Sequence, residues 1–581
     1  RLLRSELFEP IFVDGCRKAI FAATPKGELR ECKAQPVRSY EQIKPCHITE
    51  YGNGYIYDFG QNNAGIYRLD INGQSGQKVK MMFFELMRNG KPFRDEMIFA
   101  YRNDVDYDIQ RDEYICVDGS QSYVPSFTYH GYRYIYVEGI TKEQATKKLL
   151  TYIVLHSDIP ATGKFSCSDK IINRIDEIAV RSDLSNFYYF PTDCPHREKN
   201  GWTGDAVCGA EQLLYHFDCS QSLTEWLNNI VKAQRSDGVV PVIVPTGGWG
   251  FSWGNGPAWD AVIVEIPYQI YKITGDIVAV KIAALAIEKY FEYVATKKNA
   301  DGLLEYGLGD WCEMGGRITT PLEVTDTLTI IDMTAKAEEL FVALGNKSVA
   351  EKCSVLHNEL VAAFRKKYIK GGRIEIKPQT ASAMSLEYGV FIVYEIEYAR
   401  ADLKAAMNAS GGKMQIGVLG AKVLFNALTK AGMTDIAYNA VRGPEYPSYG
   451  YLLKHEATTL WESFVEMEKD ELPCDSYNHY FWGSVTAWFY RSLAGLNITS
   501  HNTVEINPHP INQLDYAEAE YALNGRKISV KWQRDGDAIS VNIYNENFSG
   551  IVKIDGYSVD GKKECILKYG ENFFMFTATT R

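Results

Sequence analysis

Hydrophobic and polar residues alternate over short stretches in the early part of the chain. Residues 55–60, 66–71 and 78–83 are rich in aromatic and β-branched residues and are separated by Gly or Asn turns, and residues 127–137 repeat the pattern. Several short alternating segments at this spacing are typical of strands in an all-β domain. We therefore predict a β-sandwich domain over residues 46–160.

After Pro160 the apolar residues recur every three or four positions, as in Ile171, Ile175 and Ile178. This spacing places apolar side chains on one face of a helix, and it continues with Gly- and Pro-bearing loops to about residue 500. About a dozen helices of ordinary length fit such a span. We predict an all-α domain over residues 161–500, and successive helix pairs of this number can close into a ring of inner and outer helices, an (α/α) barrel.

Strand-like alternation returns in residues 527–532, 539–544 and 550–554. These segments predict a C-terminal β-sandwich domain over residues 501–581. Residues 1–45 resemble the end of a preceding β-domain followed by a linker. The predicted fold class is therefore multidomain α+β, with a central helical barrel flanked by β-sandwich domains.

Composition narrows the class of protein. The chain has 62 Lys and Arg against 73 Asp and Glu, a net charge of −11, which argues against a nucleic-acid partner because such proteins need a basic stripe. No apolar run is long enough to span a membrane, so we expect no membrane partner. Aromatic residues make up 13% of the chain, which suits either sugar-stacking surfaces or a large aromatic core.

The cysteines and the start of the chain bear on its location. The twelve cysteines form no CxxC pair, and this low density favours reduced thiols. The chain begins at Arg1 and shows no signal peptide. These observations favour a cytoplasmic location, and no oligomeric state is predicted.

One irregular segment, residues 193–205, concentrates polar chemistry. Its charged and aromatic members are Asp193, Arg197, Glu198, Lys199, Trp202 and Asp205. Its Pro and Gly residues predict a loop, and the apolar residues 206–215 that follow predict a buried helix. Neighbouring negative charge raises the pKa of a carboxyl that must stay protonated to act as a general acid. A loop in which Arg197 and Lys199 only neutralise three acids fits the same residue types.

A second acidic position is Glu462, which follows Trp461 in an apolar stretch. It is either a functional carboxylate or a helix-start acid satisfied by backbone donors. His479 lies further along, in an Asn-His-Tyr sequence, and a lone His is more often a core residue than a catalyst. Carboxylates that bind hydroxyls and rings that cover apolar faces occur together in sugar sites. Asp310 and Trp311 form another cluster of an acid and a ring, and a Gly- and Pro-rich loop contains Trp249, Trp253 and Trp259. Two distant carboxylates on one rim of a helical ring would supply a general acid and a general base.

Motifs of other enzyme classes fail on context. The G-x-S-x-G string at residues 250–254 lacks the strand and helix that a nucleophile elbow needs. Residues 455–459 begin like a zinc-protease motif but lack its second His. No His and Cys spacing suits zinc, and no glycine-rich phosphate loop is present. We therefore predict no metal and no cofactor.

The run from Asp193 to Asp205 resembles the D-C-P-x-R-E-x-x-G-W-x-G-D signature of bacterial α-L-rhamnosidases of glycoside hydrolase family 78. Residues 58–62, 127–134, 458–462 and 478–480 resemble further landmarks of that family, in the same order. The resemblance implies an (α/α)6 barrel flanked by β-sandwiches. It also implies an inverting hydrolase that releases terminal non-reducing α-L-rhamnose from a rhamnose-containing glycoside.

The same resemblance implies roles for individual residues. Glu198 would be the general acid and Glu462 the general base. The residues expected to hold rhamnose hydroxyls or to tune the acid are Asp193, Arg197, Asp205 and His479. The residues expected to line the sugar site with rings are Trp202, Trp259 and Trp311, with Asp310 in the same cluster and Trp253 as an alternative to Trp259.

The chain departs from the family pattern at one position that matters. Family members usually have Gly where this chain has Glu456, so a second carboxylate lies shortly before Glu462. The Trp461–Glu462 pairing favours Glu462 as the base. Two further hypotheses stay open: a carbohydrate-binding protein that has kept the barrel without the chemistry, and a related glycosidase that acts on another sugar.

Overall fold

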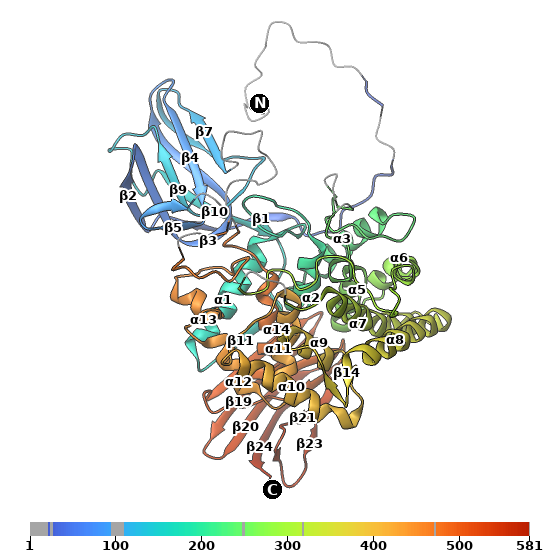
Figure 1. Cartoon of the computed structure of the whole chain (residues 1–581). Helices are drawn as coiled ribbons and strands as arrows, with labels where there is room; N and C mark the ends of the chain where they lie inside the picture. Colours follow the sequence, from blue (N-terminus) through green and yellow to red (C-terminus); the bar gives the residue numbers. More distant parts are fainter. Residues whose placement is uncertain are drawn as a thin grey trace.

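The computed structural model describes residues 21–23, 27–93, 110–246, 250–251, 253–315, 319–469, 472–473 and 475–579. Much of the segment 1–45, predicted as a remnant and linker, lies outside these residues. Figure 1 shows a sheet built from the N-terminal part, helices in the centre and C-terminal sheets at the far end. The prediction of a multidomain protein of mixed helices and sheets is confirmed.

The first sheet has eight strands with the order β1-β10-β3-β9-β4-β7, and β2 and β8 also pair with β3. These strands are β1 Val37–Ile43, β2 His47–Tyr51, β3 Gly54–Gly73, β4 Lys78–Phe84, β7 Arg111–Ile115, β8 Gly119–Tyr123, β9 His130–Glu138 and β10 Leu150–Ser157. A hairpin of β5 Leu86–Arg88 and β6 Lys91–Phe93 follows β4. Alternating aromatic residues such as Tyr57, Tyr67 and Tyr132 form the core on one face.

Two features of this sheet point toward the helices. The pairing of β3 with β9 is irregular between Asp58 and Asn63, and within this irregularity the backbone N–H of Asn62 donates to Thr458 Oγ1 at 2.8 Å. Strand β4 ends at Phe84, and the next residue, Glu85, is buried. The sheet therefore presents polar groups directly to the helical part.

The central part of the chain is helical. Its helices are α1 Lys170–Ser185, α2 Thr203–His216, α3 Ser220–Ala233, α4 Pro257–Asp260, α5 Val262–Thr274, α6 Val278–Ala295, α7 Leu322–Ala343, α8 Lys347–Tyr368, α9 Gln379–Glu387, α10 Ile396–Ala409, α11 Val418–Lys430, α12 Thr434–Arg442, α13 Tyr449–Lys454 and α14 Ser484–Trp488. Helices α2 and α11 are buried along most of their length, whereas α8 and α10 bury one face only. No helix in the described part of the chain is both long and apolar enough to cross a bilayer.

Helix α2 follows the polar segment and explains why small residues occur in it. A Cβ atom at Gly204 would lie 2.3 Å from the Trp259 ring, and one at Gly209 would lie 2.5 Å from the Tyr480 ring. The absence of side chains at both positions lets these rings pack directly against the helix backbone. The N-terminus of α2, with Asp205 in its first turn, is thereby fixed inside the helical part.

Two C-terminal sheets complete the fold. The larger has the order β11-β18-β19-β20-β24-β22, with strands β11 Gly163–Cys167, β18 Tyr516–Leu523, β19 Arg526–Asp535, β20 Ala538–Glu546, β24 Gly570–Ala578 and β22 Tyr557–Ser558. The smaller has the order β16 Leu496–Ser500, β17 Thr503–Ile506, β21 Ser549–Lys553 and β23 Glu564–Ile566. Strand β11 precedes all the helices but pairs with β18, so this sheet joins both ends of the helical part.

Candidate active site

The segment 193–205 leads from the hairpin β12 Phe187–Tyr188 and β13 Phe190–Pro191 into the first turn of α2, and its residues 193–202 form a closed loop. The backbone N–H of Asp193 donates to the Asn200 carbonyl at 2.9 Å, and the Asn200 N–H donates to Asp193 Oδ1 at 2.8 Å. Lys199 has a left-handed backbone with φ of 56°, which turns the chain. The loop thus presents Arg197 and Glu198 at its tip.

Glu462 is held by a neighbouring backbone segment. Its N–H donates to the Ser476 carbonyl at 2.8 Å, and the Ser476 N–H donates back to Glu462 Oε2 at 2.8 Å. The indole N–H of Trp482 donates to the Glu462 carbonyl at 2.7 Å. Backbone and side chain of Glu462 are therefore both fixed in direction.

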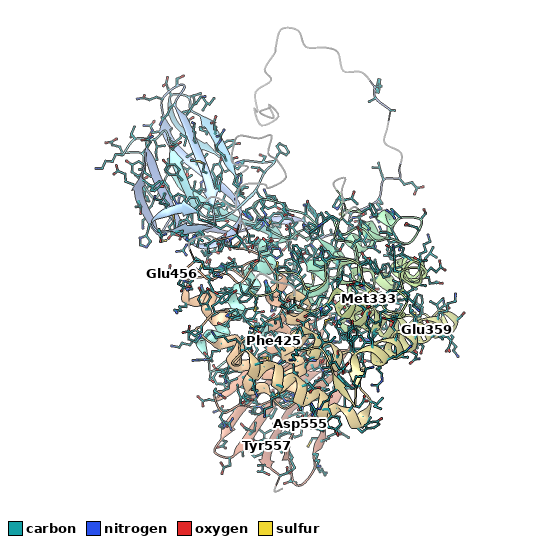
Figure 2. The ribbon with its side chains drawn as sticks, in the orientation of Figure 1. Met333, Glu359, Phe425, Glu456, Asp555 and Tyr557 are labelled. Atoms are coloured by element: carbon teal, nitrogen blue, oxygen red, sulfur yellow. The ribbon has the colours of Figure 1, made fainter. Side chains whose placement is uncertain are left out.

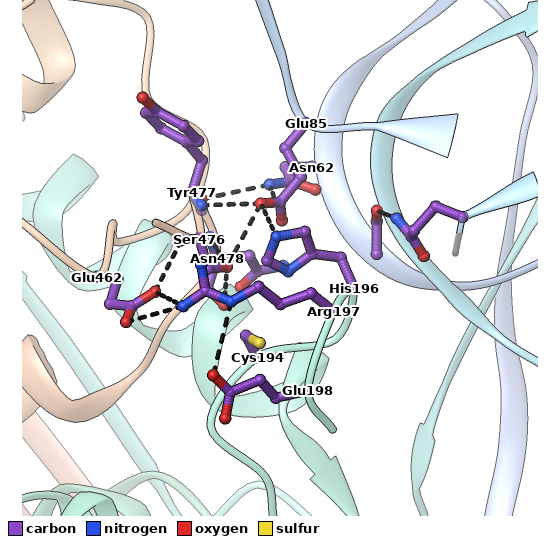
Figure 3. Close-up of polar contacts among 12 residues, drawn as sticks. Asn62, Glu85, Cys194, His196, Arg197, Glu198, Glu462, Ser476, Tyr477 and Asn478 are labelled. Atoms are coloured by element: carbon purple, nitrogen blue, oxygen red, sulfur yellow. Dashed lines mark hydrogen bonds and ion pairs between the residues drawn. The ribbon is translucent and has the colours of Figure 1, made fainter. Parts of the chain in front are cut away.

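Arg197 joins the two predicted catalytic carboxylates. Its Nη2 donates to both oxygens of Glu462, at 3.2 and 3.0 Å, and its Nε lies 3.6 Å from Glu198 Oε1. Because Nε and Nη2 of one planar guanidinium are about 2.3 Å apart, the two carboxylates lie within about 9 Å of each other. Figure 3 shows Arg197 between the two glutamates.

Acidic side chains outnumber basic ones around Arg197. Burial raises the pKa of Glu462 to about 7, with Arg197 opposing the shift. Burial, with Glu198 and Asp205 nearby, raises the pKa of Asp193 well above its usual range, and burial with Glu462 nearby does the same for Asp205. Burial and Arg197 lower the pKa of His479 far below its usual value, so its neutral ring faces Asp205 with Nε2 at 3.2 Å from Oδ1.

Three tryptophans form a wall next to Glu198. The Trp202 indole N–H donates to Glu198 Oε2 at 2.8 Å. The Trp253 ring stands nearly perpendicular to the rings of Trp202 and Trp311, with centroids 5.9 and 5.7 Å away, and is 42% exposed. Trp253 therefore contacts both Trp202 and Trp311 and lies between them in the wall. Trp259, predicted for this wall, is instead buried against Gly204 of α2.

A cavity of about 520 Å³ opens beside Glu462. Its lining includes Trp311, Cys312, Tyr446, Glu462 and Asp475. This volume is in the range of small-molecule sites, which combine apolar walls with a few polar groups. Within the described residues, no group of three or more His, Cys, Asp or Glu side chains is placed to hold a metal ion.

Asp310 differs from its predicted role as a sugar-binding residue. It is fully buried, and its carboxylate accepts hydrogen bonds from the N–H groups of Gly417, Leu419 and Gly420 and from the Thr380 hydroxyl. These backbone donors belong to the start of α11, where an acid is favourable. Asp310 therefore fixes the N-terminus of α11, and its oxygens are occupied.

Glu456 lines a different cavity from the one beside Glu462. It is exposed, its φ is 58°, and it lines a second cavity of about 370 Å³ together with Arg133 and Tyr134. Figure 2 shows Glu456 at the edge of the helical part that faces the first sheet. The left-handed backbone favours Gly, in agreement with the Gly expected at this position from the motif comparison.

Glu85 and Ser476 belong to the site but were not predicted. Glu85 accepts hydrogen bonds from the Tyr477 N–H at 2.8 Å and from Asn62 Nδ2 at 3.0 Å, and it lies 3.8 Å from His196 Nε2. Burial raises the pKa of Glu85 to about 7. The available signal was an acid directly after the apolar strand β4, where burial of a carboxylate is costly without partners.

Family models match two parts of the chain. The model of the bacterial alpha-L-rhamnosidase 6 hairpin glycosidase domain matches residues 160–493, more than half of the chain. The model of the bacterial alpha-L-rhamnosidase concanavalin-like domain matches residues 49–156. The first match contains Glu198 and Glu462, and the second contains Glu85.

Known proteins resemble the chain over most of its length. It is 30% identical over 513 residues to an α-L-rhamnosidase of Streptomyces avermitilis, covering 86% of this chain and 48% of that protein. It is 26% identical over 544 residues to an α-L-rhamnosidase of Alteromonas sp. (strain LOR), covering 90% of this chain and 58% of that protein. The α-L-rhamnosidase structure from Dictyoglumus thermophilum matches with a TM-score of 0.87 and 26% identity over 97% of this chain and 66% of that one. The chain thus spans about half the length of the curated relatives.

Proposed function

The chain belongs to the bacterial α-L-rhamnosidase family, and from this premise we propose that it is an inverting glycoside hydrolase. It releases terminal non-reducing α-L-rhamnose from a rhamnose-containing glycoside. The observation that carries the proposal is the contact of Arg197 with both Glu198 and Glu462, residues far apart in the sequence. Family membership supports the substrate class, and this meeting of two carboxylates supports the chemistry.

The reaction is a single displacement. Glu462 takes a proton from water as the water oxygen attacks the anomeric carbon, and the bond from that carbon to the leaving oxygen breaks while Glu198 protonates this oxygen. A separation within about 9 Å is compatible with the range of about 6.5–9.5 Å that leaves room for water in inverting enzymes. The pKa of Glu462, raised to about 7 by burial, makes it a stronger base than an exposed carboxylate.

Neighbouring groups orient the sugar. The raised pKa values of Asp193 and Asp205 support protonated carboxyls, which can both donate to and accept from hydroxyls. Neutral His479 beside Asp205 supports the same role. The rings of Trp202, Trp253 and Trp311 would cover the apolar face of the sugar.

The proposal includes the finer architecture. The alternation of buried helices such as α2 and α11 with one-sided helices such as α8 and α10 supports an (α/α)6 barrel over residues 161–500. The sheets on either side, antiparallel except for the parallel pair β17–β21, support β-sandwich domains over residues 46–160 and 501–581.

The test compares two aryl α-L-rhamnosides, one with a poor leaving group (phenol) and one with a good leaving group (2,4-dinitrophenol). Glu198→Gln should lose about 10³-fold in kcat on the phenyl substrate and far less on the dinitrophenyl one, because a good leaving group needs no proton. Glu462→Gln should lose about 10³-fold on both, because each substrate needs an activated water.

Proton NMR of the first-formed sugar should show the β-anomer. Early α-anomer would contradict inversion, and near wild-type kcat in both variants would contradict the assigned residues. Rhamnoside binding without turnover, measured by isothermal titration, would instead indicate a carbohydrate-binding protein. Preferential turnover of a different aryl glycoside in a panel would assign another sugar.

A further inference from the structure

Glu85 belongs to the first sheet, yet it is buried among residues that hold Glu462. It directly follows β4, its side chain is fully buried, and it contacts residues 476–477, almost 400 positions away in sequence. Its hydrogen-bond donors among the described residues are the Tyr477 N–H, Asn62 Nδ2 and the Ser476 hydroxyl, at 2.8, 3.0 and 3.3 Å. Two further groups act on it at longer range: His196, with Nε2 at 3.8 Å, and the positive charge of Arg197. Two N–H groups therefore donate to this carboxylate, and the Ser476 hydroxyl shares its one proton between Glu85 and the Asn478 carbonyl, at 3.3 and 3.2 Å.

The contacts of Glu85 continue to Glu462 through one peptide. Glu85 Oε2 accepts from the Tyr477 N–H and the Ser476 hydroxyl, and the N–H of Ser476 donates to Glu462 Oε2. Arg197 Nη2 donates to the same Glu462 oxygen at 3.0 Å, so Oε2 has two donors while Oε1 has one at 3.2 Å. Oε1 is therefore the oxygen with capacity left to accept a proton from water. Figure 3 shows Glu85, Ser476 and Glu462 in this order.

We propose that Glu85 is a positioning residue for the general base: it holds the Ser476–Tyr477 peptide so that the Ser476 N–H fixes the direction of the Glu462 carboxylate. The inference rests on the proposed function, because it assigns Glu462 the role of base. It makes the first sheet a contributor to the catalytic geometry, where it would otherwise be a separate binding module.

Geometry sets the expected size of the effect. When the Ser476 N–H moves, Arg197 is the one donor to the Glu462 carboxylate that remains among the described residues, and the carboxylate can rotate about its terminal bond. A displacement of about 1 Å at a catalytic group lowers the rate by up to about 10²-fold. Loss of the Ser476 donor also removes a hydrogen bond that favours the ionised form, so the pKa of Glu462 should rise.

The experiment measures kcat, KM and the pH profile of Glu85→Ala, Glu85→Gln and Glu85→Asp on an aryl α-L-rhamnoside. Glu85→Ala should lower kcat about 10- to 100-fold with KM within about twofold, and should move the acidic limb of the kcat/KM profile to higher pH. Glu85→Gln should restore most of kcat, because its carbonyl can accept from Tyr477. Asn62 Oδ1 has no hydrogen-bond partner among the described residues, so its amide can turn to receive the new NH₂ group, with loss of the long 3.3 Å hydrogen bond from Nδ2 to the Tyr477 carbonyl. Glu85→Asp keeps the carboxyl group but shortens its reach, so it should behave like Ala.

The matched control is Tyr188→Phe. It removes the 2.8 Å hydrogen bond from the Tyr188 hydroxyl to the Leu155 carbonyl, which also joins the helical part to the first sheet but lies outside the contacts of Ser476. The proposal is overturned when Glu85→Ala matches Tyr188→Phe in kcat and in the position of the acidic limb. When Glu85→Ala does not fold, the Gln and Asp variants decide: equal kcat in both overturns the proposal. Absence of turnover in the wild type overturns the proposed function itself, and the role of Glu85 with it.

Discussion

Two buried clusters in this protein each combine acidic and basic side chains, but they differ in the ratio of acids to cations. Around Arg197 a single guanidinium faces several carboxylates, and the pKa of Glu462 is raised to about 7 by burial. In the interior of the helices, Glu265 contacts both Lys336 and Lys422, at 2.6 and 3.1 Å. There the pKa of Glu265 is lowered: burial opposes the shift, and the two lysines outweigh it.

A second interior acid follows the same rule. Glu211 is held by Arg491 at 2.7 Å and by Lys272 at 3.3 Å, and although burial acts in the other direction, these cations lower its pKa to about 2. Where each buried acid has a cationic partner, its pKa is lowered, so the acid stays ionised and the ion pair stabilises the fold. Where acids outnumber cations, the pKa of a carboxyl is raised toward neutral pH, so the carboxyl can gain and lose a proton during a reaction. Charge balance, more than burial, distinguishes the candidate active site from the structural cluster.

The largest expected effect separates the two clusters by activity. Glu462→Gln should lower kcat about 10³-fold, because the neutral amide cannot accept a proton from water. Its thermal unfolding midpoint should stay within a few degrees of wild type, because one acid is removed from an acid-rich site. Steady-state kinetics and differential scanning calorimetry measure both quantities. A large loss of stability with unchanged kcat per folded molecule would show that Glu462 serves stability and not catalysis.

The opposite variant tests the interior. Glu265→Gln should lower the free energy of unfolding by about 3 kcal/mol, because Lys422 loses this acidic partner and Lys336 is left with Asp332 at 2.7 Å. The kcat of the folded fraction should stay within about twofold, since the described contacts of Glu265 are with Gln269, Lys336 and Lys422, away from the contacts of Arg197. Calorimetry and active-site-normalised kinetics check the two expectations. Unchanged stability would show that charge balance is not what holds this cluster.

The pH dependence sharpens the same contrast. Protonated Glu462 cannot act as a base, so kcat/KM should fall about tenfold per pH unit below about pH 7. Glu211 has a lowered pKa, so its stabilising contribution is present above the unfolded value near 4.5 and is lost only as the pH falls toward about 2. Circular dichroism should therefore stay constant between about pH 5 and 8 while activity changes. Simultaneous loss of both signals would assign the pH effect to unfolding.

Much of the fold follows from patterns in the sequence. Alternation predicts the strands of the first sheet, and three-to-four spacing predicts the helices, because each pattern reflects one buried face. Strand partners do not follow from it. Strand β1 lies in the segment predicted as a remnant and linker, yet it pairs with β10 of the first sheet. Strand β11 pairs with β18 across the whole helical part, and such long-range pairing has no local signal.

In the candidate active site, too, some residues can be predicted from sequence motifs and others cannot. The loop 193–205 and Glu462 are recognisable because their residue types occur at fixed spacing in family motifs. Asp310 and Trp259 lie close to such motifs, but burial at the α11 N-terminus and against Gly204 keeps them from the cavity. The position of Glu85 after an apolar strand indicates a buried acid, but not which site it belongs to, because its partners Ser476 and Tyr477 meet it only when the first sheet packs on the helices.

The smallest expected effect concerns Glu456, the carboxylate that competes with Glu462 for the role of base in the sequence. Glu456 is exposed and lines the cavity that contains Arg133, whereas Arg197 and the Ser476 N–H both hold Glu462. Glu456→Gln should therefore keep kcat within about twofold of wild type. Glu456→Gly should also keep kcat, with a net change in the free energy of unfolding below about 1 kcal/mol. Relief of the left-handed backbone stabilises the variant by about 1 kcal/mol, and the added freedom of the unfolded chain offsets a similar amount. A kcat loss in Glu456→Gln as large as that in Glu462→Gln would move the base to the second cavity.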